Sequence, residues 1–136
     1  MSCVLRAYGA YFDVDSFLKD SLLKPLIVYH RGAPRFPNFP RRDEVSGMNI
    51  SVSIRGFSDL RGQIDDAIRF LSDNDQELQR LRDFLGLEEM ELDFPIEGRD
   101  VAVQSDAFPA QVLSLLGGLR IGLIVSRYPT SDDPQS

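Results

Sequence analysis

The longest regular pattern of hydrophobic and polar positions runs from Ser58 to Gly86. Its hydrophobic residues recur mostly every three or four positions, and charged residues fill the positions between them. This spacing places the hydrophobic side chains on one face of a helix, which a broad apolar surface must cover. Ser58 or Asp59 is expected to cap its start, and Gly86 to end it in a left-handed conformation. The hydrophobic positions are Leu60, Ile64, Ala67, Ile68, Leu71, Leu78, Leu81 and Leu85.

Four residues that are poor helix formers, at positions 72–75, interrupt this pattern. They predict that one helix ends there and a second begins, with Asp73 and Gln76 as a capping pair for the second. A continuous helix is the alternative, because Leu71 and Leu78 keep the same heptad phase across the interruption.

Strand patterns lie on both sides of this helical segment. Hydrophobic and polar residues alternate over 48–54, which is typical of a half-buried strand. The runs at 26–29 and 121–125 are hydrophobic on both faces and therefore predict interior strands. Further strands are expected at 3–11 and at 90–94, where the strand should end at Pro95, and a short extended piece at 101–103.

Two short helices are expected between the strands. The first should begin at Asp13 or Asp15 and end before Pro25. The second should begin near Ser105 or Asp106, with Pro109 in its first turn, and end at the glycines 117–118. Their expected buried residues are Phe17, Leu18, Leu22 and Leu23 in the first helix and Val112, Leu113, Leu115 and Leu116 in the second.

This order of elements predicts one α+β domain over residues 1–128, followed by a frayed C-terminal tail at 129–136. We expect a mixed β-sheet with helices mainly on one face. The preferred arrangement is a ferredoxin-like split β-α-β fold, extended by an extra α-β unit.

Composition narrows the class of protein. The net charge of −6 argues against nucleic-acid binding, and the chain contains neither a membrane-length apolar run nor a signal-peptide pattern at its start. A single cysteine, Cys3, fits a reducing compartment, so we expect a cytoplasmic protein with no membrane association. One histidine, one cysteine and scattered carboxylates show no metal-ligand spacing, and we therefore predict neither a metal nor a cofactor.

Positive charge is concentrated near the N-terminus. Residues 1–42 carry seven Lys or Arg against three acids, whereas residues 43–136 carry eight against eighteen. Arginines and phenylalanines alternate with three prolines in the segment 31–42, and exposed Arg and Phe are common at binding hot spots. We predict that this segment contacts a partner protein with an acidic surface. In the alternative, both phenylalanines fold inward and only pin the loop to the domain. The candidate residues are Arg31, Arg35, Phe36, Phe39, Arg41 and Arg42.

The leading functional hypothesis is therefore a domain that binds another macromolecule without catalysis, and no catalytic residue is predicted. A second hypothesis is a small enzyme that uses His30, the one histidine, with a carboxylate such as Asp13 or Asp15. A third is a structural homo-oligomer formed through the sheet edge or through the central helical face.

Three motifs carry a resemblance to a known family. They are the residues 11–15 (Tyr-Phe-Asp-Val-Asp) before a short helix, Gly32 closing the second strand, and 115–119 (Leu-Leu-Gly-Gly-Leu) before the last strand. Together with the order of elements, they resemble a bacterial family of domains of unknown function, number 4279. The resemblance implies no catalytic residues. Small acidic domains of this sort are similar to immunity proteins or to regulatory partner-binding proteins, which agrees with a binding role.

Overall fold

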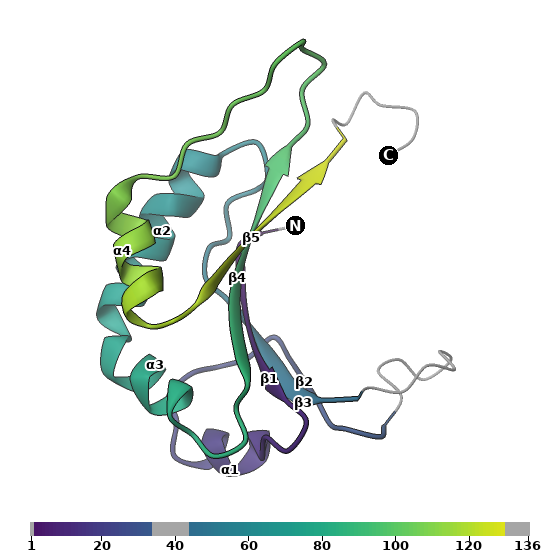
Figure 1. The fold of residues 1–136 in the computed structure, drawn as a ribbon, viewed down its shortest axis with the longest axis vertical. Helices are drawn as coiled ribbons and strands as arrows, with labels where there is room; N and C mark the ends of the chain where they lie inside the picture. The colour runs from purple at the N-terminus through teal and green to yellow at the C-terminus, as the bar shows by residue number, and fades with distance from the viewer. Residues whose placement is uncertain (1, 34–43, 130–136) are drawn as a thin grey trace.

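The computed structural model describes residues 2–33 and 44–129, which form one five-stranded sheet and four helices (Figure 1). The strands are β1 (Val4–Gly9), β2 (Ile27–Tyr29), β3 (Ser46–Ser51), β4 (Glu89–Glu97) and β5 (Gly122–Tyr128). The helices are α1 (Val14–Lys19), α2 (Leu60–Asp73), α3 (Asp75–Arg82) and α4 (Ala110–Gly118).

The sheet has the strand order β2-β3-β1-β4-β5. β1 is antiparallel to both of its neighbours, β2 is antiparallel to β3, and β5 is parallel to β4. The first two β-α-β units are therefore interleaved, since β3 lies between β1 and β2, and β1 lies between β3 and β4. The predicted α+β class with a mixed sheet is confirmed. Figure 1 views the sheet nearly edge-on, with α2, α3 and α4 along one side of it.

The central strand β1 organises the core through strict alternation. Leu5 and Ala7 are fully buried and face the helices, whereas Val4, Arg6 and Tyr8 lie on the other face and are partly exposed. The register extends the buried row into both neighbours, because Leu5 lies between Ile50 and Leu92. Ala7 lies in the same way between Met48 and Met90, which are also buried.

The central helical segment is broken, as the sequence predicts. α2 begins after Asp59, whose carboxylate accepts a hydrogen bond from the Gly62 amide at 2.9 Å. The predicted Asp73–Gln76 capping pair is wrong. Residue 74 instead separates the helices: the Asn74 side-chain amide donates to the Phe70 carbonyl at 2.9 Å and satisfies the end of α2.

Hydrophobic residues just beyond the ends of their elements are exposed, against prediction. Leu22 follows α1, which ends at Lys19, Ile54 follows β3, which ends at Ser51, and Leu85 follows α3, which ends at Arg82. Because regular structure stops before these positions, the helical and strand periodicities no longer aim their side chains at the core.

The two continuous hydrophobic runs are not interior strands. β2 and β5 are the two edges of the sheet, and each pairs with one neighbour among the described residues. β4 also differs from expectation, because it continues through Pro95 to Glu97. Pairing with β1 stops at Asp93, so a proline can follow without breaking a bond on that side. No strand forms at 101–103, where both valines are exposed.

No helix in the described ranges, 2–33 and 44–129, combines the length and the apolar character needed to cross a membrane.

The hydrophobic face of α2 and α3 is expected to supply much of the stability. Leu71, Leu78 and Leu81 are fully buried, as predicted, so Leu78→Ala should lower the free energy of unfolding by about 2–5 kcal/mol. Leu85→Ala is the matched control, because Leu85 is 89% exposed, and should change it by less than about 0.5 kcal/mol. Urea denaturation measures both. Equal effects of the two substitutions would contradict the assignment of this face to the core.

Candidate functional site

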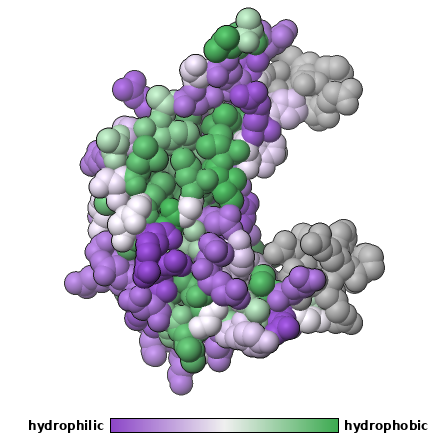
Figure 2. All heavy atoms as spheres, viewed as in Figure 1, coloured by the Kyte–Doolittle hydropathy of each residue, from purple (hydrophilic) through white to green (hydrophobic). Residues whose placement is uncertain are grey.

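An exposed hydrophobic surface lies where α4 meets the edge strand β5. Leu113 of α4 is 44% exposed, and Leu123 and Val125 of β5 are 39% and 43% exposed. These three residues define the α4–β5 surface. Figure 2 shows hydrophobic side chains gathered in the area that Figure 1 places between α4 and β5. The sequence predicts burial for all three positions, and that prediction is wrong.

The register explains why these side chains are exposed. Leu123 pairs with Leu92 and Val125 with Phe94, so both point to the helical side of the sheet, as those buried neighbours do. No strand among the described residues lies beyond β5. The hydrophobic layer between sheet and helices is therefore open at this edge.

The position of Leu113 on α4 places it toward the same opening. Gln111 lines a groove of about 500 Å³ between α2 and the segment before α4. Leu113 lies two residues later, about 200° around the helix, so it is on the side of α4 that faces away from α2. The inward positions Val112 and Leu116 are buried as predicted.

This region is also almost free of charge. From Ala107 to Ser126 the sequence contains one charged residue, Arg120, although 26% of the whole chain is charged. A guanidinium nitrogen of Arg120 lies 3.7 Å from an Asp83 carboxylate oxygen near the end of α3. A low content of charged residues is typical of the centre of protein interfaces. The low charge of this stretch is a sequence signal for the surface, although the hydrophobic pattern of the same residues predicts burial.

Most of the predicted binding segment lies outside the described residues. Arg35, Phe36, Phe39, Arg41 and Arg42 belong to 34–43, and their prediction stays untested.

Arg31, the remaining member of the predicted set, is exposed. Its backbone amide donates to the Ser46 hydroxyl at 2.8 Å, and its guanidinium lies 4.8 Å from the centre of the Tyr11 ring. Arg31 therefore contributes a positive charge beside an exposed aromatic ring.

The structure brings His30 and Asp15 together. The His30 Nε2 atom lies 2.8 Å from an Asp15 carboxylate oxygen, with the two side chains 53% and 71% exposed. Asp13 serves instead as the N-cap of α1, accepting from the Ser16 amide at 3.1 Å. Three surface hollows are lined by described residues, with volumes of about 720, 500 and 270 Å³, and His30 lines none of these three. A general base needs a substrate held within hydrogen-bond reach, and none of these three hollows, among the residues that the structure describes, holds one beside the His30–Asp15 pair.

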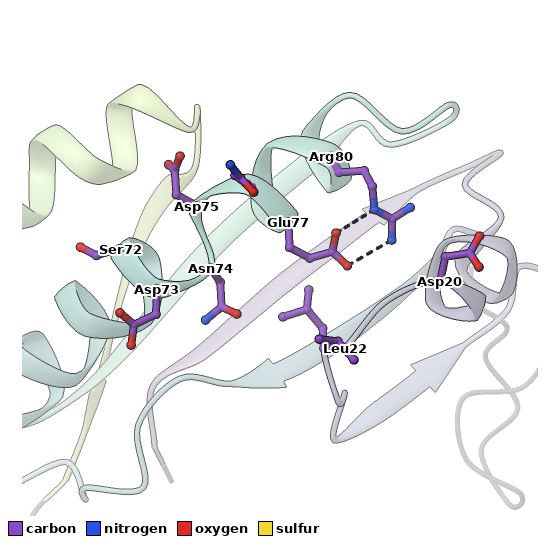
Figure 3. A pocket seen from close by; sticks show the side chains of 10 residues that line it. Asp20, Leu22, Ser72, Asp73, Asn74, Asp75, Glu77 and Arg80 are labelled. Atoms are coloured by element: carbon purple, nitrogen blue, oxygen red, sulfur yellow. Dashed lines mark hydrogen bonds and ion pairs between the residues drawn. The ribbon is translucent and has the colours of Figure 1, made fainter.

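The largest of the three hollows, about 720 Å³, lies beside the break between α2 and α3 (Figure 3). Arg80 donates to Glu77 at 2.7 and 3.1 Å and to the Phe17 carbonyl at 3.0 Å. Its guanidinium also lies 4.0 Å from the centre of the Phe17 ring, and the Ser21 hydroxyl donates to Glu77. These contacts join α3 to α1 and the segment after it. Arg80 is therefore already occupied, and the hollow is left with an excess of carboxylates.

The hydrogen bonds from Arg80 hold the pKa of Glu77 below its ordinary value, although partial burial of the carboxylate acts in the opposite direction. The same pair raises the pKa of Arg80. Glu77 is therefore ionised in the folded protein at a lower pH than in the unfolded chain.

The face of the sheet opposite the helices carries a polar network. Asp93 is buried and accepts hydrogen bonds from Arg6 and Ser126, both at 2.8 Å. Arg6 and Asp93 also line a hollow of about 270 Å³. Tyr8 donates to Glu91, and this hydrogen bond, with some burial, raises the pKa of Tyr8 to about 12. Because each of these polar groups has a partner, the network ties β1, β4 and β5 together.

Metal binding and thiol catalysis are two further kinds of site to consider among the described residues. The described residues contain no group of three or more His, Cys, Asp or Glu side chains placed to hold a metal ion. Cys3 is fully buried, and burial raises the pKa of its thiol far above the ordinary value. The thiolate that a nucleophile requires is therefore strongly disfavoured.

The Glu77–Arg80 pair should make the free energy of unfolding depend on pH. Because the folded-state pKa of Glu77 is lowered, its stabilising effect is complete above the unfolded-state pKa near 4.5 and is lost as pH falls through the folded-state value. Glu77→Gln should therefore lower the free energy of unfolding at pH 7 by on the order of 1 kcal/mol, with a loss that becomes smaller as the pH falls below the unfolded-state pKa near 4.5.

Urea denaturation of the wild type and of Glu77→Gln between pH 3 and pH 7 measures this difference. Asp73→Asn is the control, because Asp73 lines the same hollow from an exposed position and should show little effect at either pH. A deficit of Glu77→Gln that is the same at pH 3 and pH 7 would contradict the proposed role of its charge.

Comparison of the sequence with known protein families found no matching family model, and comparisons with curated proteins and with solved structures found no match either. The resemblance to the family of domains of unknown function stays a prediction.

Proposed function

We propose that this chain is a domain that binds another polypeptide without catalysis, through the α4–β5 surface. The observation that carries the proposal is the combination of exposed Leu113, Leu123 and Val125 with a stretch, 107–126, that contains a single charge. Exposed hydrophobic side chains that gather in one patch are typical of interaction surfaces, whereas scattered ones are ordinary.

Energetics supports the choice of this surface over the other exposed hydrophobic residues. Leu22, Ile54 and Leu85 are each exposed beyond the end of a helix or strand, where the backbone is irregular. The residues of the α4–β5 surface lie on a helix and a strand. This chain would therefore lose little conformational entropy when a partner binds there. A rigid, uncharged surface needs little desolvation of polar groups when it is covered.

The position of the surface also favours a polypeptide as the partner. On its side away from β4, β5 presents the N–H and C=O groups of a seven-residue edge, Gly122–Tyr128, and no described strand pairs with it there. An added strand can pair with these groups while the hydrophobic side chains beside them receive its alternate residues.

The segment around 31–42 is a separate proposal of the same class. Of its candidate residues Arg31 is described, and it stands exposed beside Tyr11 near the opposite edge of the sheet, where it follows β2. A contact between this segment and an acidic protein surface would leave the α4–β5 surface free, so the two hypotheses make independent claims.

Photocrosslinking tests the proposed function. With p-benzoylphenylalanine in place of Leu113, irradiation of the purified protein and of the protein in an extract of its source cells should yield adducts with a polypeptide. The same probe in place of Leu22, a leucine that is more exposed than Leu113 and lies away from the surface, should yield none. Adding Val125→Lys should remove the adducts formed at position 113.

Mass spectrometry of the adducts identifies the polypeptide as a second copy of this chain or as another protein. Absence of adducts at position 113, or equal yields at positions 113 and 22, would refute the α4–β5 surface as the binding site.

A further inference from the structure

We propose that the polypeptide that covers the α4–β5 surface is a second copy of this chain, which pairs its β5 strand antiparallel to this one about a two-fold axis at Ile124. The inference rests on the proposed function and specifies its partner.

The β5 edge lacks the features by which proteins protect exposed strands. β2, the other edge, is three residues long, whereas β5 has seven residues. Within Gly122–Tyr128 there is no proline, no lysine and no acidic residue, and Arg127 is the one charge. Natural sheets protect a long edge with such residues, with bulges or with a covering element. An edge of this composition is consistent with a strand that is covered when the protein is assembled.

The sequence of β5 is complementary to itself in one antiparallel register. With the axis at Ile124, Leu123 of one copy faces Val125 of the other, and Gly122 faces Ser126. The two Arg127 side chains are then far apart, at opposite ends of the paired strands. Each Arg127 lies opposite Ile121, the residue before β5, at the margin of the contact. A register centred at Val125 would instead place each Arg127 opposite Leu123, within the hydrophobic row.

The two-fold axis would also place the α4 helices of both copies over the exposed residues of β5. An axis perpendicular to the sheet at the β5 edge continues the sheet into the second copy and keeps the helices of both copies on the same side. The two α4 helices then approach each other above the joined β5 strands, with Leu113 on the side of each helix away from α2. Leu123 and Val125 of both copies would lie beneath them.

The distribution of charge favours the α4–β5 surface over the rest of the molecule as the contact between two copies. Each chain carries a net charge of −6, so two copies repel over most of their surfaces. The stretch 107–126 adds no negative charge to the contact. The chain's own C-terminal residues, Thr-Ser-Asp-Asp-Pro-Gln-Ser at 130–136, are polar and acidic and are unsuited by composition to cover a hydrophobic opening.

Sedimentation velocity across a range of protein concentrations provides the first test. The wild type should sediment as a dimer that dissociates on dilution, and Leu123→Lys should raise the dissociation constant by roughly tenfold or more, because pairing would bury the ammonium group. Ile54→Lys is the control: Ile54 is almost fully exposed outside the surface, and this change should leave the dimer intact. A monomeric wild type at every concentration, or a dimer that tolerates Leu123→Lys, overturns the inference.

Disulfide trapping provides a second test that does not depend on destabilising the dimer. Ile124→Cys places a thiol on the axis, where the two Cα atoms would be about 5 Å apart and a disulfide can form in oxidised glutathione. Gly122→Cys is the control on the same strand, since a side chain there meets no atom closer than 3.7 Å. Its two copies would lie about 14 Å apart along the strands, beyond the reach of a disulfide.

The buried Cys3 is the one native thiol, so a dimer trapped by Ile124→Cys alone reports the pairing directly. Equal trapping of both variants, or trapping of neither, overturns the antiparallel register. If the wild type is monomeric while position 113 crosslinks to a different protein, the proposed binding function stands and the second copy is excluded as its partner.

Discussion

One hydrophobic layer, between the sheet and α2–α3, supports the rest of this structure. Leu5 and Ala7 of the central strand β1 contribute to it from below, and Leu71, Leu78 and Leu81 from above. All of these side chains are buried, and truncation of any of the leucines leaves a cavity that the neighbouring side chains fill only in part. The strands on either side of β1 present their own hydrophobic faces to the same helices.

The helices cover the sheet unequally. Phe108, just before α4, packs on Phe94 of β4 with ring centres 5.2 Å apart. Beyond β4, Leu123 and Val125 continue the same hydrophobic face and remain partly exposed. The open edge is therefore a consequence of the core itself: a fifth strand has been added to the sheet, and α4 lies too close to α2 to cover it completely.

Polar contacts set the positions of segments that are far apart in the sequence. Arg80 joins α3 to α1 through the Phe17 carbonyl, and Asp93 joins three strands through Arg6 and Ser126. The buried Gln63 side chain donates to the Pro95 carbonyl at 3.0 Å and so holds α2 against β4. The partly exposed Arg80 contacts contribute modest net energy, whereas the buried Gln63 and Asp93 side chains would be costly to leave without their partners.

Local spacing in the sequence was sufficient for the class of fold. It predicted the α+β composition, the mixed sheet, the break near residue 74 and the burial of Leu71, Leu78 and Leu81. These features depend on contacts between residues one or two turns apart, or on alternation along one strand, so the pattern along the chain contains them. Of the candidate sites, the sequence named Asp15 as one carboxylate that could pair with His30.

The tertiary structure alone decided which strands are edges. Residues 26–29 and 121–125 have the composition of interior strands, and nothing in a hydrophobic run indicates how many neighbours the strand will have. Pairing partners are chosen by contacts across the whole chain, and here they placed β2 and β5 at the two ends of the sheet. The exposure of Leu123 and Val125, and with it the β5 part of the candidate binding surface, therefore followed from strand order.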